Sequence, residues 1–187
     1  FNLKESRISG FETLLRWDQP ERGPIPPADF IPVAEDTGMI VAIGEWVLRE
    51  ACRIAAHWPE RVNVAVNLST VQFRNRNLFD SVKAALESSG LSPARLELEV
   101  TESLLLTESD ATLRMLHRLR SLGVRISMDD FGTGYSSLSY LRSFPFDKIK
   151  IDQSFVKSLA AKEDSRAIVK AVIGLGSSLG MSTTAEG

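Results

Sequence analysis

Short, mostly apolar segments alternate with longer amphipathic segments along this chain of 187 residues. The short segments are rich in β-branched residues, which is typical of strands buried in a parallel sheet. They predict strands at residues 10–17, 61–69, 95–102, 123–130, 146–152 and 181–187. Strands that alternate with helices indicate an α/β fold built around a parallel sheet.

The longer segments predict four helices, at residues 39–58, 77–90, 109–123 and 163–180. The first helix shows helical spacing of five residues, Ile43, Trp46, Val47, Glu50 and Ala51. The second and third end in Gly90 and Gly123, and glycine often terminates a helix in the left-handed conformation. Ser109 or Asp110 is suited to cap the start of the third helix.

The predicted strands fit either an open, doubly wound sheet or most of an eight-stranded (β/α)8 barrel. Polar groups favour the barrel, because nearly every strand carries one at its C-terminal end. These groups are Glu12, Arg16, Asn67, Glu99, Glu102, Asp129, Asp130, Lys150, Asp152 and Glu186. A TIM-like barrel builds its active site from such strand ends. Six strands cannot close the barrel, so we expect a single domain, residues 1–187, that lacks about the first and last strands.

Composition narrows the class of protein. The formal net charge of −2 gives no basic field for a nucleic-acid polymer. Cys52 is the only cysteine, which excludes an internal disulfide and fits a reducing compartment; we expect it to be buried in a helix. No apolar run approaches the roughly 20 residues of a membrane helix, and no signal peptide is recognisable. We expect a cytoplasmic piece of a longer protein, and leave open a membrane tether elsewhere in it.

The segment 128–138, "MDDFGTGYSSL", places Asp129 and Asp130 side by side. Two adjacent carboxylates repel each other, and burial of either is costly without a nearby positive charge. Carboxylates that point inward from several parallel strands would converge, and Mg²⁺ or Mn²⁺ would offset their charge. One carboxylate can bridge two such ions about 3.5–4 Å apart. The sequence therefore predicts a two-metal site suited to hydrolysis at phosphorus, with Asn67 offering a carbonyl oxygen.

Simpler structural roles remain open for several of these residues. Glu12 is also placed for a salt bridge with Arg16. Asn67 is suited to cap a strand end, and Asp152 to pair with Lys150.

The loop after the paired aspartates has its own alternatives. Ser136 and Ser137 are suited to cap a helix, and Gly132 and Gly134 to allow a tight turn. The letters "DFG" also match a metal-binding motif of protein kinases. That interpretation fails because no glycine-rich nucleotide loop or H-R-D loop accompanies them.

The segments "ETLLRW", "VNLS", "LELEVTE", "DDFGTGYSSL", "KIKIDQSFV" and "AEG" occur in the order and approximate spacing of EAL domains. The chain thus resembles, over essentially its whole length, the bacterial phosphodiesterases that open cyclic di-GMP. The resemblance implies a (β/α)8-like barrel with one antiparallel strand and two Mg²⁺ or Mn²⁺ ions. It also implies hydrolysis of one 3′,5′-phosphodiester bond to give linear pGpG.

The resemblance also implies residue roles. Metal ligands would be Glu12, Asn67, Glu99 and Asp129, with Asp129 and Asp130 bridging to the second ion. Lys150 resembles a lysine that orients the attacking water, and Glu186 a glutamate proposed as a base or an outer-sphere ligand. Glu102 resembles a glutamate that anchors the loop 131–137, which is tied to dimerisation in the family. Arg16 resembles an arginine that meets the substrate phosphate, and we assign Asp152 to substrate binding as well.

One departure from the family pattern is Thr13, which replaces the alanine of the name-giving motif. Strand alternation points it away from Glu12, so we expect little effect. Other functions stay open: a catalytically silent cyclic di-GMP receptor, a scaffold that acts through dimerising helices, or another metal-dependent hydrolase. The intact ligand positions favour the enzyme. We expect a homodimer and a GGDEF or sensory domain elsewhere in the full-length chain.

Overall fold

The computed structural model describes residues 1–106, 110–132, 141, 144, 146–159 and 163–186. They fall into two compact units, residues 1–98 with 122–124, and residues 99–121 with 125–187. The single domain expected from the sequence stays a prediction. Ser109, Gly134, Ser136 and Ser137, and with them the caps and the turn predicted there, lie outside the described residues. So does the predicted loop beyond Gly132.

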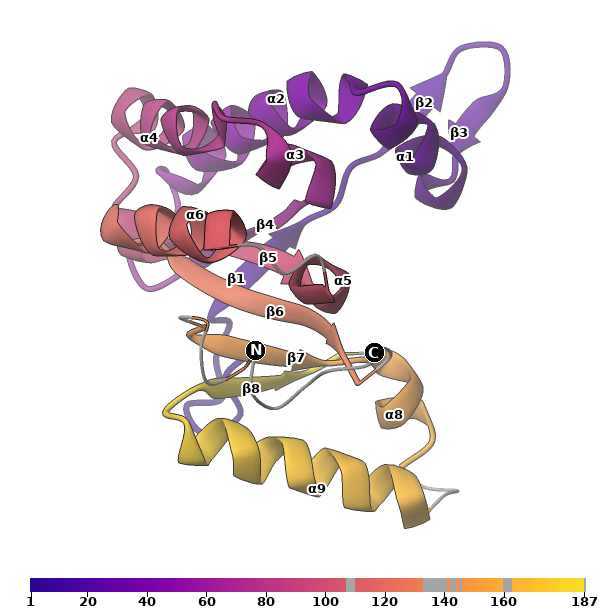
Figure 1. Cartoon of the computed structure of the whole chain (residues 1–187), viewed down its shortest axis with the longest axis vertical. Coiled ribbons are helices and arrows are strands. Elements are labelled where there is room, and N and C mark those ends of the chain that lie inside the picture. Colours follow the sequence, from indigo (N-terminus) through magenta and orange to yellow (C-terminus); the bar gives the residue numbers. More distant parts are fainter. Residues whose placement is uncertain (107–109, 133–140, 142–143, 145, 160–162, 187) are drawn as a thin grey trace. The chain divides into compact units, whose positions relative to one another are not determined.

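The order of the strands distinguishes a barrel from a doubly wound sheet (Figure 1). Six strands form one sheet in the order β1-β4-β5-β6-β7-β8, which is also their order in the chain. Their bounds are β1 Gly10–Thr13, β4 Asn63–Leu68, β5 Leu96–Thr101, β6 Arg125–Phe131, β7 Lys148–Ile151 and β8 Ser182–Ala185. The pairs β1–β4, β6–β7 and β7–β8 are parallel. A doubly wound sheet would reverse its order at a switch point, so the order supports the barrel alternative.

In the first unit, helix α2 (Met39–Ala55) packs against β4 and against α4 (Leu78–Ser89) (Figure 1). The residues buried on α2 are Ile40, Gly44, Leu48, Ala51, Cys52 and Ala55. Of the five residues with helical spacing in the sequence only Ala51 lies on this face, and Trp46 is 53% exposed. Small residues determine which face of α2 is buried, since a Cβ on Gly44 would meet Gln72 Nε2 at 2.0 Å.

Cys52 is fully buried in α2, as expected, and burial raises the pKa of its thiol to about 11. Only the thiolate reacts with alkylating reagents, so its reaction should be slow at pH 8 and rise as the pH approaches 11. We predict that iodoacetamide labels the native protein at pH 8 at least about 100-fold more slowly than the urea-unfolded protein. Mass spectrometry over time measures both rates. Equal rates would show that α2 opens readily.

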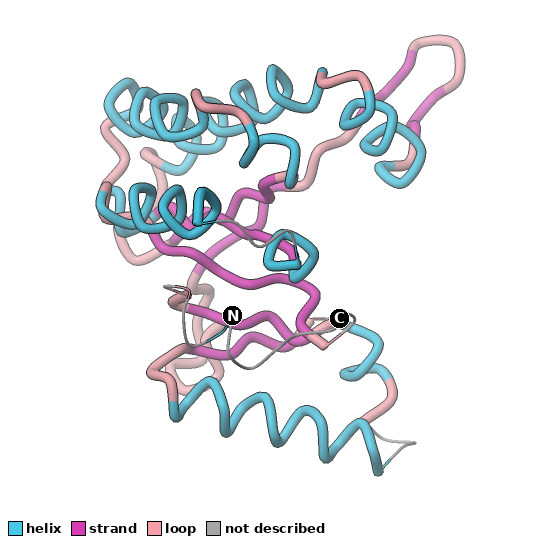
Figure 2. The backbone as a smooth tube through the Cα atoms, in the orientation of Figure 1, coloured by secondary structure: helices cyan, strands magenta, loops and turns pink. Residues whose placement is uncertain are grey.

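The predicted strand 10–17 is too long. Strand β1 ends at Thr13, and Trp17 begins a separate hairpin of β2 (Trp17–Gln19) and β3 (Gly23–Ile25), which was not predicted (Figure 2). Gly23 has φ +72°, a value that glycine adopts without strain. The Trp17 ring packs edge-on against Phe30 of α1 (Pro27–Asp36), with ring centroids 5.6 Å apart. Strand alternation therefore cannot place Arg16 on the same face as Glu12.

In the second unit, helix α9 (Glu163–Ser178) packs against strands β7 and β8 (Figure 2). Gly176 allows this approach, because a Cβ there would lie 2.7 Å from Thr183 Cγ2. Helix α6 (Asp110–Ser121) contacts β6. The other helices that position the site are α3 (Thr70–Arg74) in the first unit and α5 (Glu102–Leu106) and α8 (Gln153–Lys157) in the second. The predicted glycine ends are confirmed, with Gly90 at φ +69° after α4 and Gly123 at φ +91° after α6.

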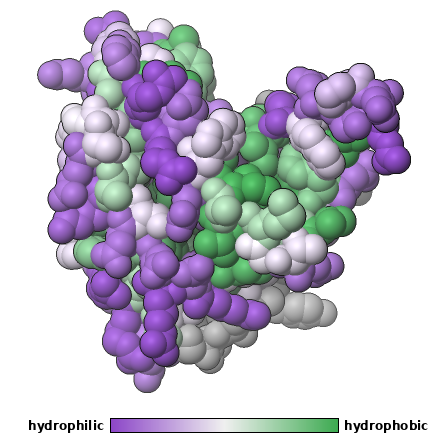
Figure 3. All heavy atoms as spheres, turned by 90° about the horizontal axis from the view of Figure 1, so that it is seen from above, coloured by the Kyte–Doolittle hydropathy of each residue, from purple (hydrophilic) through white to green (hydrophobic). Residues whose placement is uncertain are grey.

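Several large apolar side chains remain exposed in each unit. Phe11 and Leu14 are 50% and 57% exposed in the first, and Ile173 is 47% exposed in the second. Figure 3 shows apolar surface on one face of the molecule, next to hydrophilic side chains. Among the described helices, none has the length and apolar character that a membrane crossing requires.

Candidate metal centre at the strand ends

A bulge in β6 explains how two adjacent aspartates can serve one site. In a regular strand their side chains would point to opposite faces. Here the pairing of β6 with β7 shifts register between Met128 and Phe131, and Asp130 has φ +54°. This left-handed residue turns the strand, so that carboxylate oxygens of Asp129, Asp130 and Glu186 lie within 4.8 Å of one another. The three acids thus form a cluster of the size that holds a metal ion.

Lys150 lies among carboxylates that come from neighbouring strands. Its Nζ donates to Glu186 Oε1 at 2.7 Å, Glu99 Oε2 at 2.8 Å and Asp129 Oδ2 at 3.1 Å. Burial alone would lower the pKa of Lys150, which is 5% exposed. Hydrogen bonds to Glu186 and Glu99, with the charges of Glu99 and Asp129, outweigh burial and raise its pKa above the ordinary value. Lys150 is therefore an ammonium cation throughout the physiological pH range.

The charge of this cluster favours a further cation. Four carboxylates, of Glu99, Asp129, Asp130 and Glu186, gather around the ammonium of Lys150. Glu99 and Asp129 are only 3% and 8% exposed, so water does little to screen them. Acidic oxygens with no thiolate or imidazole among them are the donors that Mg²⁺ and Mn²⁺ prefer. The residues present therefore fit the metals that the sequence predicts.

A second pair of predicted ligands meets in the first unit. Glu12 of β1 is in register with Ala65 of β4, two residues before Asn67 on the same strand face. Asn67 Nδ2 donates to Glu12 Oε1 at 2.7 Å, which leaves the amide oxygen of Asn67 for another partner. Arg16 donates instead to the carbonyl oxygen of Leu15 at 2.9 Å, so the salt bridge between Glu12 and Arg16 is not formed.

A capping residue follows Asn67 closely in the chain. Ser69 caps α3: its hydroxyl accepts from Val71 N, and its own N–H donates to Gln72 Oε1. The alternative role of Asn67 as a strand-end cap stays a prediction. Our sequence reasoning missed this capping box, although the Ser-x-x-Gln spacing signals one. Nor did it foresee the left-handed Asp130, for which an aspartate before Phe-Gly is only a weak signal.

Thr13 turns toward the neighbouring strand, where its hydroxyl donates to the carbonyl oxygen of Ala65 at 2.8 Å. We predict that Thr13→Ala lowers the free energy of unfolding by about 1 kcal/mol, because one hydrogen bond is lost. Turnover of substrate should change less than about two-fold, since the side chain has no charge to offer the site. Urea titration and an activity assay measure both. A large loss of activity without a loss of stability would contradict the assignment.

Glu102 is 3% exposed, and its Oε2 accepts a hydrogen bond from Gly132 N at 3.2 Å. This contact joins the start of α5 to the residue that follows β6. It is the kind of contact that an anchor of the loop 131–137 would make, and that role stays a prediction.

Gly132 cannot easily be replaced. Its φ is +99°, and a Cβ there would lie 2.9 Å from Phe155 Cε2. We predict that Gly132→Ala lowers the free energy of unfolding by about 1–3 kcal/mol through strain and overpacking. Gly174→Ala in α9 is the matched control: it meets nothing within 4 Å, and should stabilise by up to about 1 kcal/mol. Urea unfolding of both variants distinguishes the two cases, and equal effects would rule out strain at Gly132.

Asp152 caps α8 and does not pair with Lys150. Its Oδ1 accepts from Ser154 N at 2.9 Å and from the Ser154 hydroxyl. The hydrogen bond from the Ser154 hydroxyl, followed by that from Ser154 N, lowers the pKa of the Asp152 carboxyl. The assignment of Asp152 to substrate binding stays a prediction.

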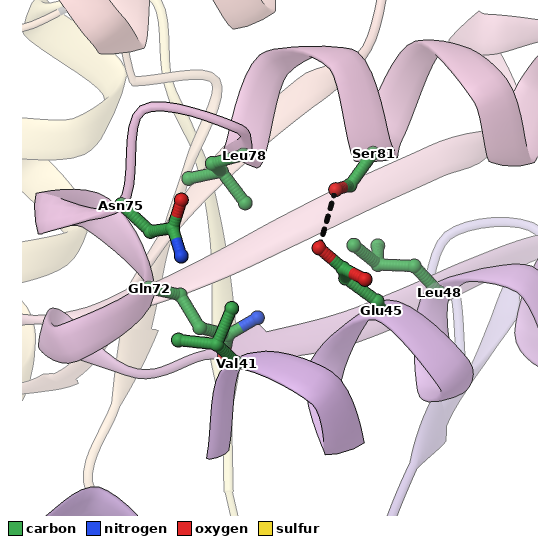
Figure 4. A pocket seen from close by; sticks show the side chains of 7 residues that line it. All are labelled: Val41, Glu45, Leu48, Gln72, Asn75, Leu78 and Ser81. Carbon is green, nitrogen blue, oxygen red and sulfur yellow. Dashed lines mark hydrogen bonds between the residues drawn. The ribbon is translucent and has the colours of Figure 1, made fainter. Parts of the chain in front are cut away.

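A small pocket lies between α2, α3 and α4 (Figure 4). It is lined by Val41, Glu45, Leu48, Gln72, Asn75, Leu78 and Ser81, and Ser81 Oγ donates to Glu45 Oε1 at 3.1 Å. It contains none of the predicted site residues. Its cavity volume of about 10 Å³ lies far below the roughly 300–1,000 Å³ of typical ligand sites. The strand-end cluster therefore remains the candidate site.

A parallel sheet in barrel order, with buried acids at its strand ends, defines an α/β protein of the TIM-barrel type with a candidate metal centre. The family model described as "EAL domain" matches residues 1–187. The chain belongs to the EAL domain family, which confirms the resemblance seen in the sequence.

Curated relatives agree with this family. Protein y4lL of Sinorhizobium fredii, named as uncharacterized, is 56% identical over 186 residues, which cover 100% of this chain and 22% of the relative. The bifunctional diguanylate cyclase/cyclic di-GMP phosphodiesterase MucR of Pseudomonas aeruginosa is 50% identical over 182 residues, covering 95% and 27%. The chain thus spans about a quarter of the length of these relatives.

Solved structures confirm the predicted fold class. The structure described as PaMucR phosphodiesterase in complex with c-di-GMP has a TM-score of 0.92 and 49% identity, covering 97% of this chain and 75% of that one. The EAL enzyme Bd1971 in its cGMP-bound form has a TM-score of 0.92 and 32% identity, covering 100% and 53%. The fold is therefore the EAL type of α/β barrel fold.

Proposed function

We propose that this chain is a metal-dependent phosphodiesterase that hydrolyses cyclic di-GMP to linear pGpG. The observation that carries the proposal is the cluster of Glu99, Asp129, Asp130 and Glu186 around the buried Lys150. A fold needs a strong reason to bury carboxylates, and binding of divalent cations is such a reason. The names of relatives support the substrate, because several are cyclic di-GMP phosphodiesterases.

The proposed ligands of the first ion are Glu12, Asn67, Glu99 and Asp129. Asp129 and Asp130 are proposed to form the bridge to the second ion. This assignment of ligands comes from the family resemblance. Two Mg²⁺ or Mn²⁺ ions, when bound, would supply a nucleophilic hydroxide at neutral pH and offset charge that develops on the phosphate.

The remaining residues act on water and substrate in this proposal. In the metal-free protein, the three N–H donors of Lys150 go to three carboxylates. When these carboxylates bind metal ions instead, the ammonium would be released to donate to the oxygen of the attacking water. Glu186 accepts the proton of that water or holds an outer-sphere ligand. The guanidinium of Arg16 suits bidentate binding of a phosphate. Asp152 is proposed to contact the substrate, and Glu102 to hold the loop after Gly132.

Electrostatics predicts how substrate binding depends on metal. Cyclic di-GMP carries two negative charges, and the cluster holds four carboxylates against one ammonium. Without divalent cations the site would repel its substrate. Metal ions should therefore strengthen substrate binding as well as hydrolysis.

The wider assembly is also proposed. The MucR relative is named as bifunctional, and this chain spans only 27% of it. We propose a GGDEF or sensory domain in the same full-length protein, and a cytoplasmic EAL domain that forms homodimers. Size-exclusion chromatography with light scattering measures the dimer.

The decisive experiment incubates the purified protein with cyclic di-GMP and Mg²⁺ or Mn²⁺, and follows the products by chromatography. The proposal expects pGpG with either metal and none after EDTA. Calorimetry on the same samples measures binding. Binding without pGpG would make the protein a receptor, and neither binding nor pGpG would favour the scaffold.

A further inference from the structure

Glu35, which the proposed function does not use, contacts the turn that follows a predicted metal ligand. Glu35 lies near the end of α1, and its Oε1 accepts a hydrogen bond from Ser69 Oγ at 2.5 Å. This is the short distance of a hydroxyl that donates to a charged carboxylate, a bond stronger than one between neutral groups. Ser69 comes directly after β4 and only two residues after Asn67.

Ser69 is held by three separate contacts. Besides donating to Glu35, its hydroxyl accepts from Val71 N at 3.2 Å, and its N–H donates to Gln72 Oε1 at 3.0 Å. Gln72 is itself 4% exposed and packs directly against Gly44 of α2. The turn after β4 is therefore fixed to α1 through Glu35 and to α2 through Gln72.

Asn67 lies at the end of β4, two residues before this turn begins at Ser69. The flanking residues Val66 and Leu68 are 1% and 5% exposed, so the strand itself is anchored by packing. Asn67 is the last outward-facing residue before the turn, and its amide lies 2.7 Å from Glu12 Oε1. We expect a change in the turn to alter the direction of the Asn67 amide, and small displacements of a metal ligand weaken metal binding.

We propose that Glu35 is a positioning residue: through the Ser69 hydroxyl it fixes the turn after β4 and so aims Asn67 at a bound divalent cation. The proposal rests on the proposed function in so far as that function makes Asn67 a metal ligand. It assigns no contact with substrate or metal to Glu35 itself.

The test compares Glu35→Ala, Glu35→Gln and Ser69→Ala in the purified protein. Mn²⁺ binding is measured by calorimetry and by the electron paramagnetic resonance signal of free Mn²⁺, and pGpG formation is measured against Mn²⁺ concentration. Glutamine keeps an oxygen that can accept from Ser69, whereas alanine does not. Asp36→Ala, at the next and exposed position of α1, is the matched control.

We expect Glu35→Ala and Ser69→Ala each to weaken Mn²⁺ binding about 10-fold, as other residues that support metal ligands do. The double variant should bind Mn²⁺ no more weakly than Ser69→Ala alone, because Glu35 acts only through the Ser69 hydroxyl. Glu35→Gln should recover most of the affinity, and Asp36→Ala should match the parent. Thermal unfolding identifies any part of the effect that is only loss of folded protein.

Each outcome has a distinct meaning. An active parent with unchanged Mn²⁺ binding in Glu35→Ala overturns this inference and leaves the proposed function intact. A parent that makes no pGpG, but loses Mn²⁺ affinity in the variants as expected, overturns the function and keeps the inference. Additive effects in the double variant, or no recovery with glutamine, also overturn the inference. So does a parent that binds no Mn²⁺.

Discussion

Asp129→Asn is expected to lower pGpG formation by at least about 100–1,000-fold, while the protein stays folded. Asparagine has the shape of aspartate and can still accept the hydrogen bond that Asp130 N gives to Asp129 Oδ1. It removes one negative charge from the centre of the cluster, next to Lys150. Cation binding should therefore weaken with activity. Turnover assays and Mn²⁺ titration measure the two losses together.

Asp164→Asn is the matched control for this experiment. Asp164 lies exposed in the first turn of α9, so the substitution makes the same chemical change without touching the cluster. It should leave turnover and metal binding unchanged. If Asp129→Asn kept more than about a tenth of the activity with an unaltered metal dependence, the cluster would not be the catalytic centre.

Lys150→Met is expected to destabilise the metal-free protein by about 3–5 kcal/mol. Methionine fills a similar volume but leaves Glu99, Asp129 and Glu186 without the cation that now contacts all three. Added Mn²⁺ should restore much of the lost stability, because it supplies positive charge to the same carboxylates. Turnover should stay low with saturating metal, since the group proposed to orient the water is gone. Urea unfolding with EDTA and with Mn²⁺ measures the stability change.

Lys170→Met in α9 serves as the control for the loss of a lysine. Lys170 is exposed, and a substitution there should change stability by no more than about 0.5 kcal/mol. A Lys150→Met protein that was as stable as its parent in EDTA would show that the carboxylates are not held by this ammonium.

The strand pattern predicted much of this architecture because barrel folds obey a simple rule. The C-terminal ends of parallel strands meet at one edge, so polar residues at those ends are brought together. That rule anticipated that side chains at these strand ends come together, and Lys150 does contact Glu99, Asp129 and Glu186, which come from separate parts of the chain. That alternation points Thr13 away from Glu12 stays a prediction; its hydroxyl donates to the carbonyl oxygen of Ala65 on the neighbouring strand.

Local geometry could not be predicted in the same way. The apolar stretch from Leu14 to Trp17 contains no glycine or proline, so nothing in it signalled the end of β1 at Thr13. The buried face of α2 depends on small residues such as Gly44, and the spacing of large apolar residues does not identify such a face. The contact of Glu35 with Ser69 joins residues 34 positions apart and has no local signature.

The left-handed conformation of Asp130 has a consequence for how such a chain would drift under mutation. A residue with φ +54° carries a conformational cost that glycine avoids. Replacement of Asp130 by glycine would also relieve repulsion from its neighbour, so the folded state would gain stability while a carboxylate proposed to bridge two metal ions disappeared. If the proposed function is right, a lineage no longer selected for cleavage would thus gain stability from the mutation that ends catalysis. The fold would outlast the activity, and a receptor would be the natural descendant of the proposed enzyme.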